Sequence, residues 1–88
     1  MKLLKFYADW CGPCKILTKM LEEEDFGVEI EVESIDIMGD DPRIAKFGVR
    51  AIPLLVVVDE EGNPIREVTG AQKAQTLREF ICPTTPQF

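Results

Sequence analysis

Hydrophobic and polar residues follow two different periods in the first part of the chain. Residues 2–8 are apolar or aromatic apart from two lysines, which predicts a short buried strand that ends at Asp9. From residue 11 to residue 24 the apolar side chains recur at helical spacing, which predicts an amphipathic helix ending near Gly27. Residues 28–37 begin with a strict alternation of apolar and acidic residues, so we expect a second strand whose glutamates face solvent.

This order of strand, helix and strand predicts a right-handed βαβ unit in which the two strands are parallel. A turn at residues 39–42 follows it and leads into a short helix. We expect Asp41 to be the N-cap of this helix and Pro42 to occupy its first helical position, with the end at Phe47–Gly48.

The remainder of the chain predicts a hairpin and a final helix. Residues 54–58 are apolar and mostly β-branched, residues 59–63 have the composition of a turn, and residues 64–69 form a more polar strand. After Gly70, apolar residues at helical spacing predict an amphipathic helix that ends before Pro83 (Ala74, Leu77, Phe80 and Ile81). The predicted order is therefore βαβ, a short helix, then ββα.

The length and charge of the chain limit its organisation and its partners. A chain of 88 residues buries roughly 60–65 % of its unfolded surface, which suffices for one core. We expect one domain, residues 1–82, and a C-terminal tail, residues 83–88. The net charge of −6 disfavours nucleic acid as a ligand. The apolar stretch at the N-terminus is too short for a signal peptide or a membrane span, so we expect a cytoplasmic protein that does not contact membranes.

The cysteines carry the candidate chemistry. Three cysteines cannot all pair with one another, and Cys11 and Cys14 lie only three positions apart, which indicates a reactive dithiol rather than a structural disulfide framework. The chain has no histidine, and Cys82 and carboxylates alone remain as further ligands, so we expect no metal site. Cys82 itself is interpreted as an incidental thiol.

A Cys-x-x-Cys pair where a strand leads into a helix has a direct chemical use. The unpaired N–H groups and the positive end of the helix dipole stabilise a thiolate at Cys11, the predicted nucleophile. Cys14 lies one turn further on the same face, where it can attack a mixed disulfide at Cys11, and is the predicted resolving thiol. Pro13 is tolerated in the first helical turn, and Gly12 leaves space beside the sulfur.

The segment around this dithiol resembles the active-site signature of the thioredoxin family. The resemblance rests on FYADWCGPCK at residues 6–15 and continues through FGVRAIP at residues 47–53, Gly62 and residues 69–71. It covers residues 1–82 and lacks the first strand and helix of full-length thioredoxins, as in minimal members from archaea and phages. The resemblance implies a thioredoxin-like α/β fold, with a four-stranded mixed sheet flanked by helices.

The resemblance also implies a substrate groove. In such proteins the proline that corresponds to Pro53 is cis and lies against the dithiol, and the backbone beside it pairs with an extended substrate segment. Trp10, Ile52 and Gly70 are then expected to form the rim of this groove, with Gly12 and Pro13 beside them.

The chain departs from the family at one internal position. Thioredoxins usually have a buried aspartate, active in proton transfer, where this chain has Lys5, and the lysine partner of that aspartate aligns with Ser34. Neutral Lys5 can accept the proton of Cys14, or charged Lys5 can favour the Cys14 thiolate. The interpretation that we favour is structural: the stem of Lys5 snorkels outward, or its ammonium pairs with a carboxylate such as Asp36.

The expected activity is the reduction of protein disulfides by a monomer that binds no cofactor. The resemblance implies that an NADPH-dependent thioredoxin reductase regenerates the dithiol, although a glutaredoxin-like link to glutathione is an alternative. An oxidising role is a second alternative, which the Gly12-Pro13 dipeptide disfavours. A redox-independent accessory subunit that binds partners with the same groove is the alternative from another class.

Overall fold

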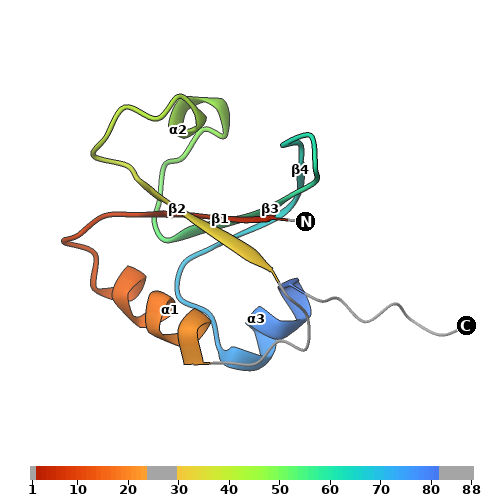
Figure 1. The fold of residues 1–88 in the computed structure, drawn as a ribbon. Helices are drawn as coiled ribbons and strands as arrows, with labels where there is room; N and C mark the ends of the chain where they lie inside the picture. The colour runs from red at the N-terminus through yellow and green to blue at the C-terminus, as the bar shows by residue number, and fades with distance from the viewer. Residues whose placement is uncertain (1, 24–29, 82–88) are drawn as a thin grey trace, which may run out of the picture.

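The computed structural model describes residues 2–23 and 30–81, and these form seven regular elements (Figure 1). In chain order they are β1 (Lys2–Tyr7), α1 (Gly12–Glu23), β2 (Glu31–Asp36), α2 (Arg43–Lys46), β3 (Leu54–Val58), β4 (Pro64–Thr69) and α3 (Ala74–Ile81). The four strands form one sheet in the order β2-β1-β3-β4. Strand β1 runs parallel to β2 and antiparallel to β3, and β3 pairs with β4 as an antiparallel hairpin. The α/β fold with a four-stranded mixed sheet, expected from the sequence, is therefore confirmed.

The boundaries of two elements differ from the sequence prediction. Helix α2 begins at Arg43, so Pro42 is its N-cap and not its first helical residue. The carboxylate of Asp41 still accepts a hydrogen bond from the backbone N–H of Arg43, at 2.9 Å, so it satisfies one free donor of this short helix. Strand β2 begins at Glu31. The earlier part of the predicted strand, the predicted helix end near Gly27 and the tail after residue 82 lie outside the described residues.

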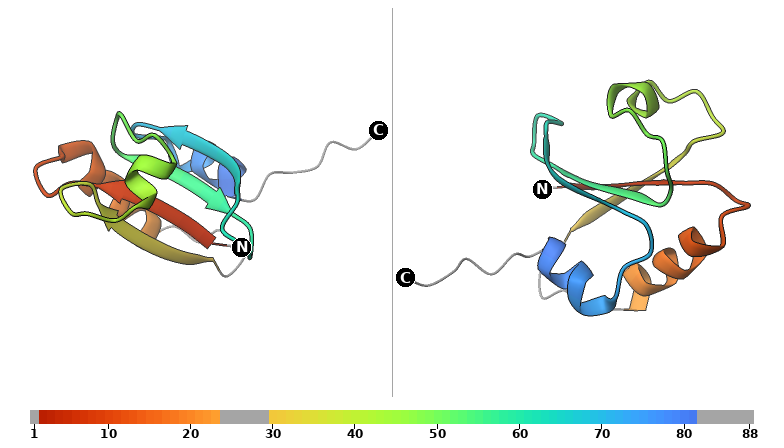
Figure 2. Two further views of the ribbon diagram at one scale, coloured as in Figure 1. Left: turned by 90° about the horizontal axis from the view of Figure 1, so that it is seen from above. Right: turned by 180° about the vertical axis from the view of Figure 1, so that it is seen from behind.

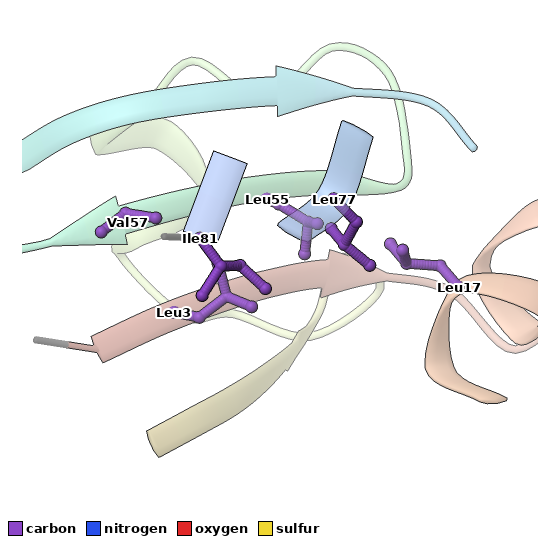
Figure 3. Close-up of a cluster of buried hydrophobic side chains, with 6 residues drawn as sticks. All are labelled: Leu3, Leu17, Leu55, Val57, Leu77 and Ile81. Carbon is purple, nitrogen blue, oxygen red and sulfur yellow. The ribbon is translucent and has the colours of Figure 1, made fainter. Parts of the chain in front are cut away.

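Helices cover both faces of the sheet. Figures 1 and 2 show α1 and α3 on one side and α2 on the other. Because side chains alternate along a strand, Leu3 and Leu4 of β1 belong to different cores. The core under α1 and α3 is shown in Figure 3 and consists of Leu3, Leu17, Leu55, Val57, Leu77 and Ile81.

The second core lies between the sheet and α2. It is built from the alternate residues of β1 and β3, together with Ile35 of β2 (Leu4, Phe6, Ile35, Leu54, Val56 and Val58). Phe47, at the end of α2, meets the ring of Phe6 edge-on with the ring centroids 6.0 Å apart. Every residue of β3 is buried, which explains why this strand is apolar throughout while β2 and β4 are not.

The register of β1, β3 and β4 brings three loops together at the same end of these strands. Phe6, near the end of β1, pairs with Leu54 at the start of β3, and Leu54 pairs in turn with Thr69 at the end of β4. The residues that follow β1 and β4 therefore lie beside those that precede β3. These are the segments that carry Cys11, Gly70 and Pro53.

A cluster of charged side chains joins α2 to strand β2. The guanidinium of Arg43 binds the carboxylates of Glu33 and Asp41, and the ammonium of Lys2 lies 3.1 Å from Glu33. Hydrogen bonds from Arg43 and Lys2 lower the pKa of Glu33 from 4.5 to about 2. Hydrogen bonds from Arg43 lower the pKa of Asp41 from 3.8 to about 2. Folding therefore favours the ionised form of both carboxylates.

This cluster predicts a loss of stability in acid. Because both pKa values are lower in the folded state, the cluster stabilises the fold above about pH 4.5, and this contribution disappears as the pH falls towards 2. In urea unfolding, we expect Arg43→Met to be less stable than the parent at pH 7, with a difference that shrinks progressively between pH 4.5 and pH 2. The exposed Lys73→Met is the control for removal of a positive charge. A difference that stays constant with pH contradicts this account.

Candidate functional site

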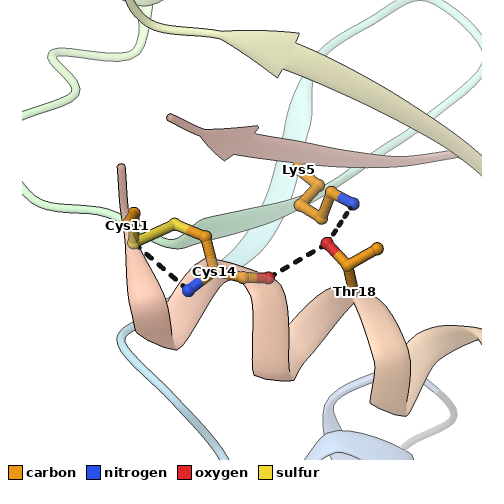
Figure 4. Close-up of a disulfide and its surroundings, with 4 residues drawn as sticks. All are labelled: Lys5, Cys11, Cys14 and Thr18. Carbon is orange, nitrogen blue, oxygen red and sulfur yellow. Dashed lines mark hydrogen bonds between the residues drawn. A yellow bond between two sulfur atoms is a disulfide. The ribbon is translucent and has the colours of Figure 1, made fainter. Parts of the chain in front are cut away.

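Cys11 and Cys14 form a disulfide where β1 leads into α1 (Figure 4). Their Cα atoms are 5.2 Å apart, and both side chains are buried, with 5 % and 2 % of their surfaces exposed. Cys11 immediately precedes the helix and Cys14 lies in its first turn. This is the arrangement that the spacing of the two residues predicts, and it confirms that the two sulfurs can bond.

One backbone N–H of α1 points at the sulfur of Cys11. The N–H of Cys14 donates a hydrogen bond to the Sγ atom of Cys11 at 3.2 Å. The N–H of Cys11 itself is bound to the carbonyl of Ala8 at 3.1 Å, which fixes the loop before the helix. No acidic side chain lies in the first turn of α1 to offset the helix dipole. A thiolate at Cys11 would receive the same N–H and the same field, which are the conditions that activate a cysteine.

Gly12 and Pro13 form the exposed start of α1 between the two cysteines. Pro13 occupies the first helical turn, as expected, where its lack of an N–H costs no helical hydrogen bond. A Cβ atom at Gly12 would meet no atom within 4 Å. The space that a side chain at Gly12 would enter is therefore open, and the fold itself does not require a glycine there.

The loop before β3 lies against the disulfide. The Ile52–Pro53 peptide bond is cis, as the resemblance implies. The side chain of Ile52 packs on the small cluster formed by Ala8, Cys11 and Cys14. The carbonyl of Pro53 accepts a hydrogen bond of 2.8 Å from the N–H of Gly70, so the loops before β3 and after β4 are tied together. Gly70 has a φ of 91°, a conformation that residues with a Cβ rarely adopt.

Trp10 is the most exposed residue of the expected rim. It precedes Cys11 in the chain, and 67 % of its surface is accessible to solvent. An exposed aromatic side chain of this size offers a large apolar surface, which a binding partner would remove from contact with water. The structure thus brings Ile52 to the dithiol and joins Pro53 to Gly70, while Trp10 extends from the same loop into solvent.

The side chain of Lys5 points into the protein and not out of it. Only 6 % of its surface is exposed, and its Nζ atom donates a hydrogen bond of 2.7 Å to the hydroxyl of Thr18 on α1 (Figure 4). Snorkelling and a pair with Asp36, the interpretations favoured from the sequence, are therefore wrong. The carboxylate of Asp36 instead accepts a hydrogen bond from the backbone of Met38. Ser34 pairs with Lys5 in the register of the parallel strands, but it is exposed.

Thr18 is a residue of the site that the sequence analysis did not identify. Its hydroxyl accepts the hydrogen bond from Lys5 and donates one of 3.0 Å to the backbone carbonyl of Cys14. The available clue was the spacing, because Thr18 lies four residues after Cys14 and therefore on the same side of α1. A cavity of about 210 Å³ adjoins this point and is lined by Tyr7, Ala8, Asp9, Cys14, Lys15 and Thr18.

Two further observations concern cofactors and membranes. Within residues 2–23 and 30–81, no three histidine, cysteine, aspartate or glutamate side chains come together in a way that could hold a metal ion. Over the same residues, no helix combines the length and the hydrophobicity needed to cross a membrane. Cys82 lies outside the described part of the chain.

Comparisons with known proteins agree with this geometry. A sequence model of the thioredoxin family matches residues 1–82. The thioredoxin of Staphylococcus haemolyticus is 36 % identical over 83 residues, which are 92 % of this chain and 79 % of that protein.

The same family appears among solved structures. A mutant thioredoxin from Halobacterium salinarum is 35 % identical and superimposes with a TM-score of 0.78, covering 91 % of this chain and 70 % of its own. The thioredoxin of Fasciola hepatica is 30 % identical with a TM-score of 0.77, covering 91 % and 76 %. Together with the Cys11–Cys14 disulfide, these matches establish the activity as thiol–disulfide exchange, for which proteins with disulfides are the substrates. The chain belongs to the thioredoxin family.

Proposed function

We propose that this protein reduces disulfides in other proteins, with Cys11 as the nucleophile and Cys14 as the resolving thiol. The observation that carries the proposal is the hydrogen bond from the N–H of Cys14 to the sulfur of Cys11 at the start of α1. It supports the asymmetry between the two cysteines, because the thiolate of Cys11 gains this N–H and the helix dipole.

The reaction proceeds by two sulfur exchanges. The thiolate of Cys11 attacks one sulfur of the substrate disulfide, a bond between the two sulfurs forms, and the second substrate sulfur leaves as a thiolate. Cys14 then loses its proton, and its thiolate attacks the Sγ atom of Cys11. The Cys11–Cys14 disulfide forms and the remaining substrate sulfur leaves with the electron pair. Both released thiolates take protons from water, so the substrate is reduced by two electrons.

The protein must then be reduced again. The oxidised form returns to the dithiol by the same chemistry in reverse, with a dithiol donor that supplies two electrons. We infer that this donor is an NADPH-dependent thioredoxin reductase, that the protein works as a monomer, and that it does so in the cytoplasm, where thiol donors keep cysteines reduced.

We infer that substrates bind over Trp10, Ile52 and Gly70, with Pro53 behind them and Gly12 and Pro13 at the side. Exposure of Trp10 and the packing of Ile52 against the dithiol support this placement. A substrate segment in extended conformation would pair with the backbone next to Pro53 and present its disulfide to Cys11.

Serine variants test the reductase activity and the two roles. In insulin reduction, Cys11→Ser is expected to lose all activity above the uncatalysed reaction, because the thiol that attacks the substrate disulfide is absent. Cys14→Ser is expected to lose turnover but to accumulate a mixed disulfide with the substrate, detectable by mass spectrometry, since the resolving thiol is absent. Cys82→Ser is the control and should match the parent. Activity that survives both active-site substitutions, or is absent from the parent, contradicts the proposal and favours the accessory-subunit alternative.

A redox titration separates reductant from oxidant. With Gly12-Pro13 between the cysteines, we expect a reduction potential near that of thioredoxins, about −270 mV. Equilibration of the parent with glutathione buffers, followed by alkylation and mass spectrometry, measures it. A value near about −120 mV, which is typical of a strong oxidant, contradicts the reductant role.

Two glycines allow a matched test of the substrate groove. Gly70 and Gly62 both have positive φ angles, 91° and 85°, and a Cβ atom would meet no neighbour at either position. Alanine is therefore expected to cost each about 1–3 kcal/mol of folding free energy through backbone strain. Gly70→Ala should also raise KM for a protein disulfide, because it disturbs the backbone bound to Pro53, whereas Gly62→Ala in the β3–β4 turn should not. Equal KM values for the two variants would exclude Gly70 from the groove.

A further inference from the structure

Lys5 is the one buried charged side chain among the described residues. An ammonium that loses its water requires compensation by hydrogen bonds or by an opposite charge. Within the described part of the chain no carboxylate lies within 4.0 Å of its Nζ atom, so its hydrogen-bond partner is the hydroxyl of Thr18. A cation in this position is expensive for the fold, and Thr18, which holds it, also binds the backbone of Cys14 in the dithiol.

Hydrogen bonds connect the ammonium to the resolving cysteine. Lys5 donates to the Oγ1 atom of Thr18 at 2.7 Å, and the same hydroxyl donates to the carbonyl of Cys14 at 3.0 Å (Figure 4). Because the hydroxyl proton is used on Cys14, its lone pairs are left for Lys5. The position of the ammonium is therefore fixed relative to the first turns of α1, which carry the Cys14 sulfur.

The groups around Lys5 do not neutralise its ammonium by direct contact. On β1 the ammonium lies 5.6 Å from the centre of the Tyr7 ring, and its register partners on the adjacent strands are Ser34 and Leu55, neither of which is charged. On α1 the charged group that acts on it is Glu22, which is exposed. Burial lowers the pKa of Lys5 below its ordinary value of 10.5, and the charge of Glu22 opposes this shift.

We propose that Lys5, held by Thr18, is a positioning residue whose ammonium stabilises the thiolate of Cys14 in the resolving step. This inference rests on the proposed two-cysteine mechanism. The family's usual aspartate would accept the proton of Cys14. The ammonium of Lys5 instead stabilises the thiolate that remains after the proton is lost. Lys5 acts through its charge and does not contact the substrate.

The cavity beside Cys14 provides the route for the proton. It is lined by Cys14 and Thr18 and also by the exposed residues Asp9 and Lys15, so it reaches the surface and has room for water. The Cys14 thiol gives its proton to water there, and the resulting thiolate attacks the sulfur of Cys11. The new Cys11–Cys14 bond forms as the bond from Cys11 to the substrate sulfur breaks. The electron pair leaves on the substrate sulfur, and the charge of Lys5 is unchanged through the step.

Reaction with 5,5′-dithiobis-(2-nitrobenzoate) separates the two exchanges, with Cys82→Ser as the parent background for all variants, because a third thiol would also release thionitrobenzoate. Attack by Cys11 releases one thionitrobenzoate and leaves the other on Cys11, and Cys14 then releases the second. Stopped-flow absorbance gives a rate for each phase as a function of pH. The first phase tests the nucleophile of the proposed function, and the second phase tests the role of Lys5.

Lys5→Met is the main variant, because methionine keeps the apolar stem and removes the charge. The second phase should slow about tenfold at pH 7, and its pH midpoint should rise by about one unit, while the first phase changes little. Thr18→Val removes the hydroxyl at constant shape and should shift the second phase in the same direction by a smaller amount. Lys19→Met, which removes an exposed lysine from the next position of α1, is the matched control and should behave as the parent.

Each outcome decides between a functional and a structural lysine. The proposal is supported if the pH midpoint of the second phase rises in Lys5→Met while the urea concentration at half-unfolding does not fall. Stability should not fall, because an apolar side chain replaces a buried cation. Superimposable profiles of the second phase overturn it, as does an equal slowing of both phases with a loss of stability. If Lys5→Met does not fold, a Thr18→Val profile identical to the parent overturns it. Absence of the first phase in the parent would instead contradict the proposed function.

Discussion

The pairing of β1 with β3 is the interaction on which the other features of this protein depend. Both strands are buried on both faces of the sheet, so two separate cores hold their register. Their antiparallel alignment places the end of β1 next to the start of β3. The loop that carries Cys11 and the loop that carries Pro53 therefore meet, although they are about forty residues apart in the chain. A change of one residue in this register would exchange the two cores and separate the loops.

The site combines a rigid scaffold with an exposed surface. The sulfurs of Cys11 and Cys14 are held by the first turn of α1, and Ile52 packs on them from the side of β3. In contrast, Trp10 and the Gly12-Pro13 segment are open to solvent. This division suits the exchange of disulfides with other proteins, because the reactive atoms stay in fixed positions while the residues beside them are exposed.

The role proposed for the buried lysine would change the family mechanism without a change of fold. Lys5 lies in the middle of β1, and its buried side chain reaches α1, where its ammonium binds Thr18. A buried carboxylate and a buried ammonium affect a neighbouring thiol in opposite ways, since one takes a proton and the other stabilises the anion. The solved thioredoxins of Halobacterium salinarum and Fasciola hepatica, 35 % and 30 % identical to this chain, superimpose on it with TM-scores of 0.78 and 0.77.

The sequence by itself determined the elements and the dithiol, because these depend on neighbours within a few positions. Alternation and helical spacing predicted the strands and helices, and the three-residue spacing of Cys11 and Cys14 put both on one face of α1. Only the tertiary structure decided the position of the Lys5 ammonium, because its partner Thr18 lies on another element. The hydrogen bond from the N–H of Gly70 to the carbonyl of Pro53 likewise joins two distant loops. The start of α2 differed by one residue, since Pro42 and not Asp41 is the N-cap, although the carboxylate of Asp41 binds the backbone and the guanidinium of Arg43. Contacts between distant segments follow from how the cores pack, and local sequence patterns carry no record of that packing.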